Sequence, residues 1–331
     1  MTLRSAVAGS AAVLVLAIAI VQWLLFLFKP ETGLPGVLQV LAPHLAILGL
    51  VACLFLLAAP RRWHVAGVVA LVAVVALRFG GEWLSLPAAP LAAAEKPLTV
   101  ETWNLEVASR PPSDTIAMLL ARPADVIAVE ELQPLTADAL DADPGIRAAF
   151  PYRELKPLRN VLGLGILSRY PISGATVRYD PALLRATIDV DGRPVVVFAA
   201  HPLHGNVERY GDTRLPIGID VDQRNDELVM IRDAVDAVTA GGGQAILLGD
   251  LNTASSEPAF DRLVAGLHDA HGEVGLGTGW TWRPISLEFL GFGLIRIDHV
   301  ISTPAIRPLA VDEQCPDVGD HCLVRAELAV R

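Results

Sequence analysis

The chain has 331 residues, enough for one large domain or two modest ones, and 53% of them are hydrophobic. The formal net charge is −10 at pH 7, and only three of the 36 acidic side chains precede residue 98, whereas most of the apolar excess lies before residue 90. The acidic part repels polyphosphate backbones, which disfavours a general nucleic-acid binder but leaves a phosphoester hydrolase open, because bound cations can reverse the local field.

Three apolar runs open the chain, at residues 6–28, 37–59 and 65–86. As a helix, the first would be about 35 Å long, and the hydrocarbon core of a bilayer is about 30 Å thick. A cleaved signal peptide is the alternative for this run, but its apolar core is too long and two further runs follow. The sequence therefore predicts a membrane anchor, residues 1–86, with three transmembrane helices that contact the lipid bilayer through residues 6–86.

Basic residues near the ends of these runs predict the orientation. Arg4 precedes the first run, and Arg61 and Arg62 lie between the second and the third. Positively charged ends favour the cytoplasmic side, so three spans leave everything after residue 86 outside the cytoplasm. Lys29 and Arg78 oppose this orientation weakly.

A short segment rich in proline and alanine, residues 87–97, predicts a linker. The domain that follows is expected to cover residues 98–331. Its apolar runs and turn signals indicate a strand-rich α/β domain, including a hairpin turn at Asp191-Gly192. Strands are predicted at residues 98–104, 125–129, 165–167, 184–190, 195–200, 245–248, 294–302 and 322–330, and a helix at 222–238.

Polar side chains recur where these strands end. Each of them alone could be a turn or capping residue, but together they indicate strand ends that converge on one edge. Carboxylates and an amide without a cysteine cluster favour a hard, oxygen-ligated ion such as Mg²⁺ over Zn²⁺. The residues are Asn104, Glu131, His201, Asp250 with Asn252, Asp298 with His299, and Asp320 with His321.

Eight motifs carry a family resemblance, in this order: TWNLE, DVIAVEELQ, GILSRYPI, HPLHG, GDLNTASSEPAF, GWTW, RIDHVIST and GDHCLVRAEL. They resemble the endonuclease/exonuclease/phosphatase superfamily over essentially all of residues 98–331. The resemblance implies a four-layered α/β/β/α sandwich of the DNase I-like type and phosphoester hydrolysis that depends on Mg²⁺, or alternatively on Mn²⁺. The anchor resembles that of a bacterial subgroup, which implies a multi-pass protein of the bacterial cell membrane.

The resemblance also implies a set of metal ligands. Glu131 matches the metal-binding glutamate of the family, although Glu130 stands where the family usually has Gln and leaves an ambiguity between the two. Asn104 matches an asparagine that orients phosphate or metal. Glu106 and Asp320 stand at positions where some members have acidic ligands.

Five further residues match catalytic positions. The resemblance implies that Asp250 aligns or deprotonates the attacking water and that Asn252 donates hydrogen bonds to phosphoryl oxygens. His321 would contact the phosphoryl group while Asp298 fixes its tautomer. His201 matches a position that contacts phosphate in some members.

Two features outside the motifs remain open. Cys315 and Cys322 are seven residues apart in a domain placed outside the cytoplasm, so they are expected either to form a disulfide or to be two buried thiols. Residues 287–294 form an apolar segment that either packs on the domain or dips into the bilayer.

The sequence leaves several functions open. The first is a membrane-anchored phosphodiesterase or phosphatase whose substrate is a lipid, a small diester or a nucleic acid. An extracytoplasmic endonuclease or exonuclease is a variant of it. A non-catalytic envelope binding protein is disfavoured because every principal motif position is filled. A transport or signalling role for the spans is disfavoured because they contain few charged residues.

Overall fold

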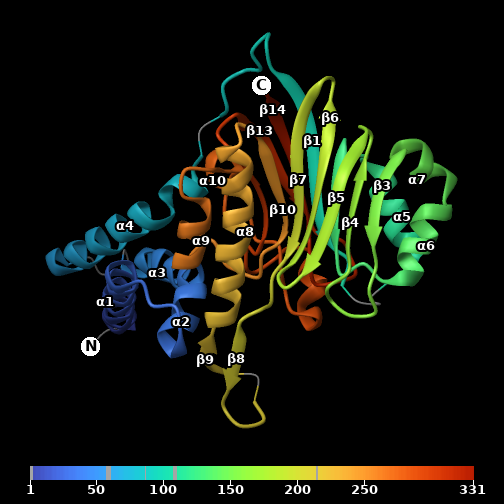
Figure 1. Cartoon of the computed structure of the whole chain (residues 1–331). Helices are drawn as coiled ribbons and strands as arrows, with labels where there is room; N and C mark the ends of the chain where they lie inside the picture. The colour runs from blue at the N-terminus through green and yellow to red at the C-terminus, as the bar shows by residue number, and fades with distance from the viewer. Residues whose placement is uncertain (1–2, 57–60, 86, 107–109, 214) are drawn as a thin grey trace.

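The computed structural model describes residues 3–56, 61–85, 87–106, 110–213 and 215–331. It consists of a helical bundle at the N-terminus and an α/β domain beside it (Figure 1). The bundle contains α1 (Leu3–Phe28), α2 (Gly33–Val40), α3 (Ala42–Leu56) and α4 (Arg62–Trp83).

The bundle corresponds to the three apolar runs, with one difference. Within the described residues, two helices are long and apolar enough to cross a membrane, and α2 with α3 count as a third span only if this pair, bent by 63°, is taken as one. The bend lies at Leu41, between α2 and α3, and Pro43 lacks the N–H that would continue the helix to the carbonyl of Gln39. The second apolar run, 37–59, is therefore bent in its first part, the number of candidate spans is two or three, and residues 57–59 lie outside the described residues.

The described part of the α/β domain contains two six-stranded sheets. In spatial order, the first consists of β13 (Ile306–Gln314), β14 (Leu323–Val330), β1 (Lys96–Asn104), β2 (Val126–Glu130), β4 (Leu164–Ser168) and β3 (Tyr152–Lys156). The second consists of β11 (His268–Asp269), β12 (Asp298–Ser302), β10 (Ala245–Asp250), β7 (Arg193–His201), β6 (Ala182–Val190) and β5 (Ile172–Tyr179).

Helices cover the outer faces of both sheets, which gives four layers (Figure 1). α5 (Pro112–Ala121), α6 (Pro134–Ala142) and α7 (Pro144–Ala149) pack on the first sheet, and α8 (Asp222–Ala240) and α9 (Pro258–Val264) pack on the second. The inner faces share one apolar core made almost entirely of Val, Ile, Leu and Ala. Because both faces are covered, β2 and β10 are buried throughout and read as continuous apolar runs. The expected four-layered fold is confirmed.

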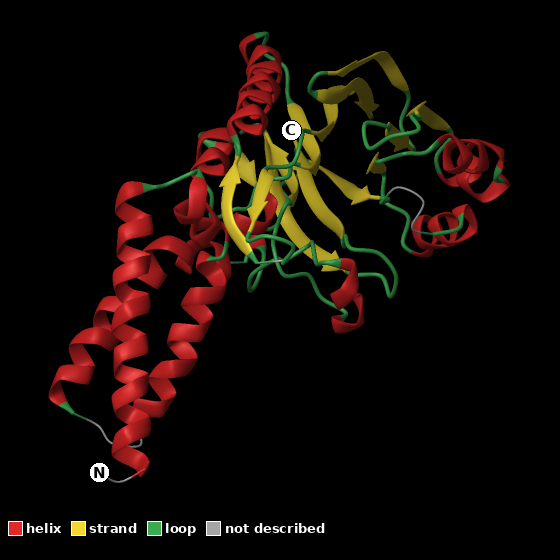
Figure 2. Cartoon of the chain, turned by 90° about the horizontal axis from the view of Figure 1, so that it is seen from below, coloured by secondary structure: helices red, strands yellow, loops and turns green. Residues whose placement is uncertain are grey.

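Three smaller elements lie outside the sandwich. β8 (Asn206–Arg209) and β9 (Pro216–Asp220) form a separate hairpin, and α10 (Ala270–Val274) packs near the end of α4. The short 3₁₀ helix η1 (Ile285–Leu290) projects from the domain on the side toward which the helical bundle extends (Figure 2).

The directions of the strands place the polar residues at the strand ends along one edge of the sandwich. β1 runs parallel to β2, and β7 runs parallel to β10, so Asn104, Glu130, His201 and Asp250 lie at the same edge. β12 is antiparallel to β10 and pairs Asp298 with Asp250. One edge of the sandwich therefore collects the side chains that the sequence placed at strand ends.

One buried carboxyl in β1 predicts a pH-dependent stability. Glu101 is 4% exposed and lies 3.6 Å from Arg325, and its burial, opposed by Arg325, raises its pKa from 4.5 to about 7. The folded protein therefore keeps a proton that the unfolded chain has lost between pH 4.5 and 7, so this group lowers the free energy of unfolding as the pH rises through that window. Glu101→Gln removes the ionisable group, so the variant does not lose stability through this pH window.

We expect Glu101→Gln to match the wild type near pH 4.5 and to be more stable by about 2–3 kcal/mol at pH 8. Thermal unfolding of the full chain in detergent at both pH values measures this difference. Glu327→Gln, an exposed position on β14, is the control and is expected to show no such difference. Equal stability of Glu101→Gln and wild type at pH 8 would contradict the prediction.

Candidate active site

Asp250 is the centre of the strand-end cluster. It ends β10 and is 2% exposed. Its Oδ2 accepts a hydrogen bond of 3.0 Å from Asn104 Nδ2 and lies 3.5 Å from His201 Nε2 and 3.6 Å from His321 Nε2. Its Oδ1 accepts the Asn252 backbone N–H at 2.9 Å. Burial alone would raise the pKa of Asp250, but His321 and His201 outweigh it and hold the carboxyl ionised.

The two histidines beside Asp250 are positively charged in this arrangement. Burial alone would lower both pKa values, but Asp298 and Asp250 raise that of His321 to about 10, and Asp250 with Glu131 raises that of His201 to about 9. His321 Nδ1 lies 3.0 and 3.1 Å from the two oxygens of Asp298. His201 Nδ1 donates to the Val161 carbonyl at 2.9 Å, which turns Nε2 toward Asp250.

The ambiguity between Glu130 and Glu131 has a geometric answer. Glu130 is fully buried and accepts a hydrogen bond from Thr102 Oγ1 at 2.9 Å, and burial raises its pKa to about 8. Glu131 adopts a positive φ of 55° and lines the cavity, where its Oε1 accepts a hydrogen bond from Asn104 Nδ2 at 3.2 Å. Of the two, Glu131 is therefore the carboxylate that faces the cavity.

The other expected residues divide into two groups. Asn252, at a positive φ of 49°, lines the cavity and donates from Nδ2 to the Pro202 carbonyl at 2.9 Å. Asp320 also lines it, and its Oδ2 accepts from Trp282 Nε1 at 3.2 Å. Glu106 does not line the cavity but lies against Gly319, the residue before Asp320, and beside Arg110. The structure thus brings the expected site residues together apart from Glu106.

The donor set fits a hard cation. Asp250, Asp298 and His321 have ligand atoms within 4.8 Å of one another, but His321 hydrogen-bonds Asp298, so these atoms share protons rather than enclose an ion. Glu131 and Asp320 line the same cavity, and Asp320 Oδ1 is buried with no hydrogen-bond partner among the residues that the structure describes. This oxygen lies 3.9 Å from His321 Nε2, beyond hydrogen-bond distance, and an oxygen-ligated cation would satisfy it.

The cavity has a volume of about 410 Å³, and some of its lining residues had no assigned role in the sequence analysis. Arg224 lines it, yet its guanidinium is 2% exposed and pairs with Glu257 at 2.7 and 3.2 Å while donating to the Asn252 carbonyl at 2.9 Å. Arg224 therefore fixes the loop of Asn252. Glu257 was not recognised in the sequence, because its partner lies 33 residues away. Val40 of α2 also lines the cavity.

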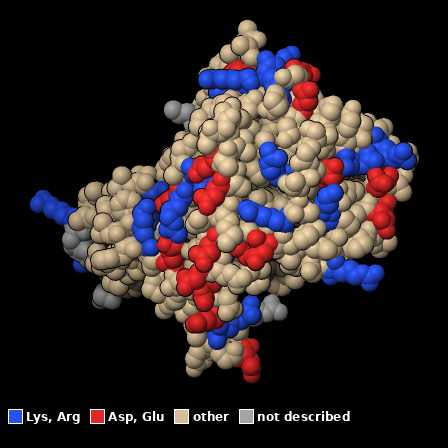
Figure 3. Space-filling view, viewed as in Figure 1, with Lys and Arg blue, Asp and Glu red and all other residues tan. Residues whose placement is uncertain are grey.

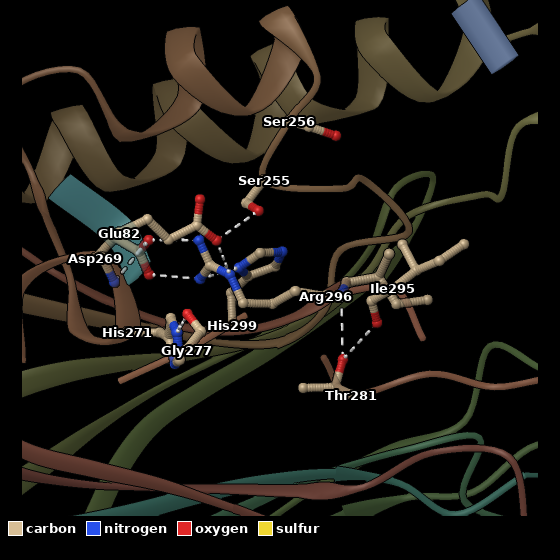
Figure 4. A network of polar contacts seen from close by, with 12 residues as sticks. Glu82, Ser255, Ser256, Asp269, His271, Gly277, Thr281, Ile295, Arg296 and His299 are labelled. Atoms are coloured by element: carbon tan, nitrogen blue, oxygen red, sulfur yellow. Dashed lines mark hydrogen bonds and ion pairs between the residues drawn. The ribbon is translucent and has the colours of Figure 1, made fainter. Parts of the chain in front are cut away.

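A buried network behind the cavity joins α4 to this site (Figure 4). Arg296 is 3% exposed and lies between Glu82, at 3.0 Å, and Asp269, at 2.8 Å. Glu82 also accepts a hydrogen bond from Ser255 Oγ at 2.8 Å. Burial and Arg296 lower the pKa of His299 to about 3. Because Arg296 only donates, neutral His299 accepts at Nδ1 and donates from Nε2 to the Thr253 carbonyl at 3.0 Å.

Comparison with known proteins agrees with this geometry. The two-sheet sandwich with its polar edge is the DNase I-like fold. A model of the "Endonuclease/Exonuclease/phosphatase family" matches residues 102–321, and the chain belongs to that family, whose members are generally divalent-metal-dependent phosphoester hydrolases. Curated proteins give no significant match.

Solved structures give the same fold. An endonuclease/exonuclease/phosphatase from Beutenbergia cavernae is 22% identical with a TM-score of 0.52, and the match covers 71% of this chain and 72% of that one. TDP2 from D. rerio, complexed with a single-strand DNA product, is 14% identical with a TM-score of 0.53 over 70% and 99%. The beta toxin of Staphylococcus aureus is 14% identical with a TM-score of 0.50 over 69% and 99%. At these identities the likeness establishes the fold alone.

Cys315 and Cys322 form a disulfide in the structure, with Cα atoms 4.0 Å apart. The bridge encloses Asp320 and His321. We expect full-length protein purified without reductant to contain one free thiol, Cys53, when denatured and titrated, and three after reduction. Three free thiols without reduction would contradict the pairing.

The Arg296 network predicts that the anchor stabilises the domain. Glu82→Gln leaves the buried guanidinium with Asp269 as its remaining carboxylate, and breaking a buried pair in this way costs about 3 kcal/mol. We expect the Tm of the full chain in detergent to fall by roughly 5–10 °C. Asp233→Asn, an exposed position on α8, is the control. A Tm for Glu82→Gln equal to that of the control would show that the network does not support the fold.

Proposed function

We propose that the chain is a metal-dependent phosphoester hydrolase, with residues 1–86 as a membrane anchor and residues 98–331 as a catalytic domain outside the cytoplasm. The observation that carries the proposal is Asp250, a buried and ionised carboxylate held between His201, His321 and Asn104 in a cavity that also contains Glu131.

Asp250 is suited to align the attacking water. It is an acceptor with fixed orientation, because Asn104 and the backbone N–H of Asn252 hold its two oxygens. A water placed against it faces the phosphorus of an ester bound in the cavity. A fixed carboxylate of this kind orients the water and accepts its proton as the bond to phosphorus forms.

The histidines and Asn252 are suited to stabilise charge on the phosphoryl oxygens. His321 presents Nε2 to the cavity while Asp298 holds Nδ1, so the ring keeps its orientation and its positive charge. Asn252 uses one amide hydrogen on the Pro202 carbonyl and has a second to donate. His201 supplies a further cationic donor on the other side of Asp250.

Glu131 and Asp320 are suited to hold the cation, Mg²⁺ or Mn²⁺, with Asn104 orienting Glu131. When bound, such an ion neutralises negative charge on the phosphoryl oxygens. Glu106 would take part only by moving from its position against Gly319.

A nuclease of the same family is the second candidate. The complex of D. rerio TDP2 with a single-strand DNA product supports it, since that protein has the same fold. The acidic charge of the domain opposes it. A non-catalytic binding protein is disfavoured by the complete set of polar residues around Asp250.

The proposal predicts that Asp250→Asn abolishes turnover while the fold persists. Asn keeps the shape of the side chain but cannot accept the proton or balance two histidinium ions. We expect kcat/KM for bis-p-nitrophenyl phosphate to fall by roughly 10³-fold or more. The assay uses full-length protein in detergent with Mg²⁺ or Mn²⁺, and the Tm of each variant shows that it is folded.

Two controls complete this experiment. Asp138→Asn, an exposed position on α6, is expected to keep wild-type turnover. Chelation by EDTA is expected to stop turnover, and Mg²⁺ to restore it. Activity that persists in EDTA, or that is the same in Asp250→Asn and wild type, would overturn the proposal.

A further inference from the structure

The cavity has a wall that comes from the membrane anchor. Val40, at the end of α2, lines it directly. α2 continues into α3 at Leu41, in a pair of apolar helices bent by 63°, so this wall belongs to the N-terminal helical bundle. Gln39 Nε2 donates to the Ser256 carbonyl at 2.7 Å, which ties α2 to the loop that follows Asp250. The cavity and the anchor are therefore one continuous structure.

α2 is held tightly against the domain. A Cβ at Gly36 would lie 2.8 Å from Ile219 Cγ2, so this glycine lets α2 approach β9 closely. Glu31, just before α2, pairs with Arg262 at 2.6 Å and accepts a hydrogen bond from Asn225 at 2.7 Å. These contacts keep Val40 in place as a cavity wall.

An apolar group of side chains lines the cavity near α2, although Arg209 of β8 also lines it. This group consists of Val40, Leu203, Val207 and Ile219. Val207 and Ile219 belong to the β8–β9 hairpin. His201, Asp250 and His321 line the charged part at the strand ends. A cavity lined by an apolar group as well as by the charged strand ends matches an amphiphilic phosphoester better than a uniformly polar cavity would.

The surface beside the cavity is also suited to a bilayer. Ile285, Phe289 and Phe292, on and just after η1, are 50%, 77% and 51% exposed. η1 projects on the side toward which the bundle extends (Figure 2). The segment before it is tied to the anchor, because Trp280 stacks on His44 of α3 with ring centroids 4.4 Å apart. Exposed aromatic side chains next to membrane helices fit a lipid surface.

The charge of the neighbouring surface disfavours a polynucleotide. Acidic side chains gather along α8 (Figure 3), where Asp222, Asp226, Asp233 and Asp236 are exposed. A long phosphate backbone entering the cavity beside α8 would meet this negative field, whereas a single lipid phosphate coming from the bilayer side would not.

We propose that this site, given the hydrolase function proposed above, takes phosphodiester lipids directly from the bilayer around the anchor. The lipid phosphate lies between His201 and His321, and the hydrocarbon lies along Val40, Val207 and Ile219. In the reaction, one P–O bond forms to a water oxygen and one P–O ester bond breaks. Asp250 accepts one proton of the water, the departing alkoxide gains one proton to leave as the alcohol, and the other proton of the water stays on the new phosphate oxygen.

The test compares two substrates in one preparation. Full-length protein is placed in nanodiscs of phosphatidylethanolamine and phosphatidylglycerol, and Mg²⁺-dependent release of the water-soluble product is measured beside turnover of bis-p-nitrophenyl phosphate. We expect both activities in the wild type. In Val207→Asp, and in Phe289→Ser combined with Phe292→Ser, we expect the ratio of lipid turnover to small-diester turnover to fall by about tenfold or more, equivalent to 1.4 kcal/mol.

Leu135→Ser is the matched control, because Leu135 is 70% exposed but lies on α6, away from the bundle (Figure 1). Its ratio is expected to stay at the wild-type value. Turnover of the small diester without turnover of lipid overturns the lipid inference and leaves the hydrolase proposal standing. Faster turnover of single-stranded DNA than of lipid also overturns the lipid inference and leaves the hydrolase proposal standing. Loss of turnover on every phosphoester overturns both.

A binding measurement gives an independent readout. Folded Asp250→Asn protein in the same nanodiscs, doped with phosphatidylethanolamine that carries a diazirine on its acyl chain, is photolysed and digested. We expect labelled peptides from residues 37–40 and 203–219, and competition by unlabelled phospholipid. Label confined to the outward faces of α1 and α4 would overturn the proposed position of the hydrocarbon.

Discussion

A buried guanidinium joins the two parts of this molecule. Arg296 precedes β12 and is almost fully enclosed, and an isolated charge in such a place would cost several kcal/mol. Two carboxylates compensate it, Asp269 from the domain and Glu82 from the last turn of α4. The charge balance of the domain therefore includes a residue of the anchor. Because Arg296 also fixes His299, which holds the Thr253 carbonyl, the same network supports the loop after Asp250.

The polar edge in front of this network has its own balance of charge. Asp250 and Asp298 are neutralised by His201 and His321, and these pairs account for the ionised state of Asp250. Glu131 and Asp320 are additional carboxylates in the same cavity. Carboxylates in excess of the nearby positive charges, next to an oriented hydrogen-bond acceptor such as Asp250, suit a hydrolase that binds a divalent cation. A pocket that binds only apolar ligands does not require them.

Much of the domain follows from local sequence. Strands buried on both faces read as apolar runs, and parallel strands bring their carboxyl ends to one edge, so Asn104, Glu131 and Asp250 could be grouped before any coordinates were known. The hairpin at Asp191-Gly192 also follows, since both residues have positive φ. Contacts between distant segments could not be predicted. The pairing of Arg224 with Glu257 and the position of Val40 in the cavity depend on tertiary packing, which periodicity does not encode.

The bend at Leu41, a local feature of the backbone, determines whether Val40 can line the cavity. A continuous second span would carry Val37 and Val40 through the bilayer, away from the cavity. Pro43 ends the continuity, and the bend of 63° lays α2 along β9, where Gly36 permits the close approach. An apolar helix turned in this way packs on another apolar surface, which the β8–β9 hairpin and the wall of the cavity provide. The N-terminal helical bundle therefore contributes a wall of the cavity, through Val40 of α2.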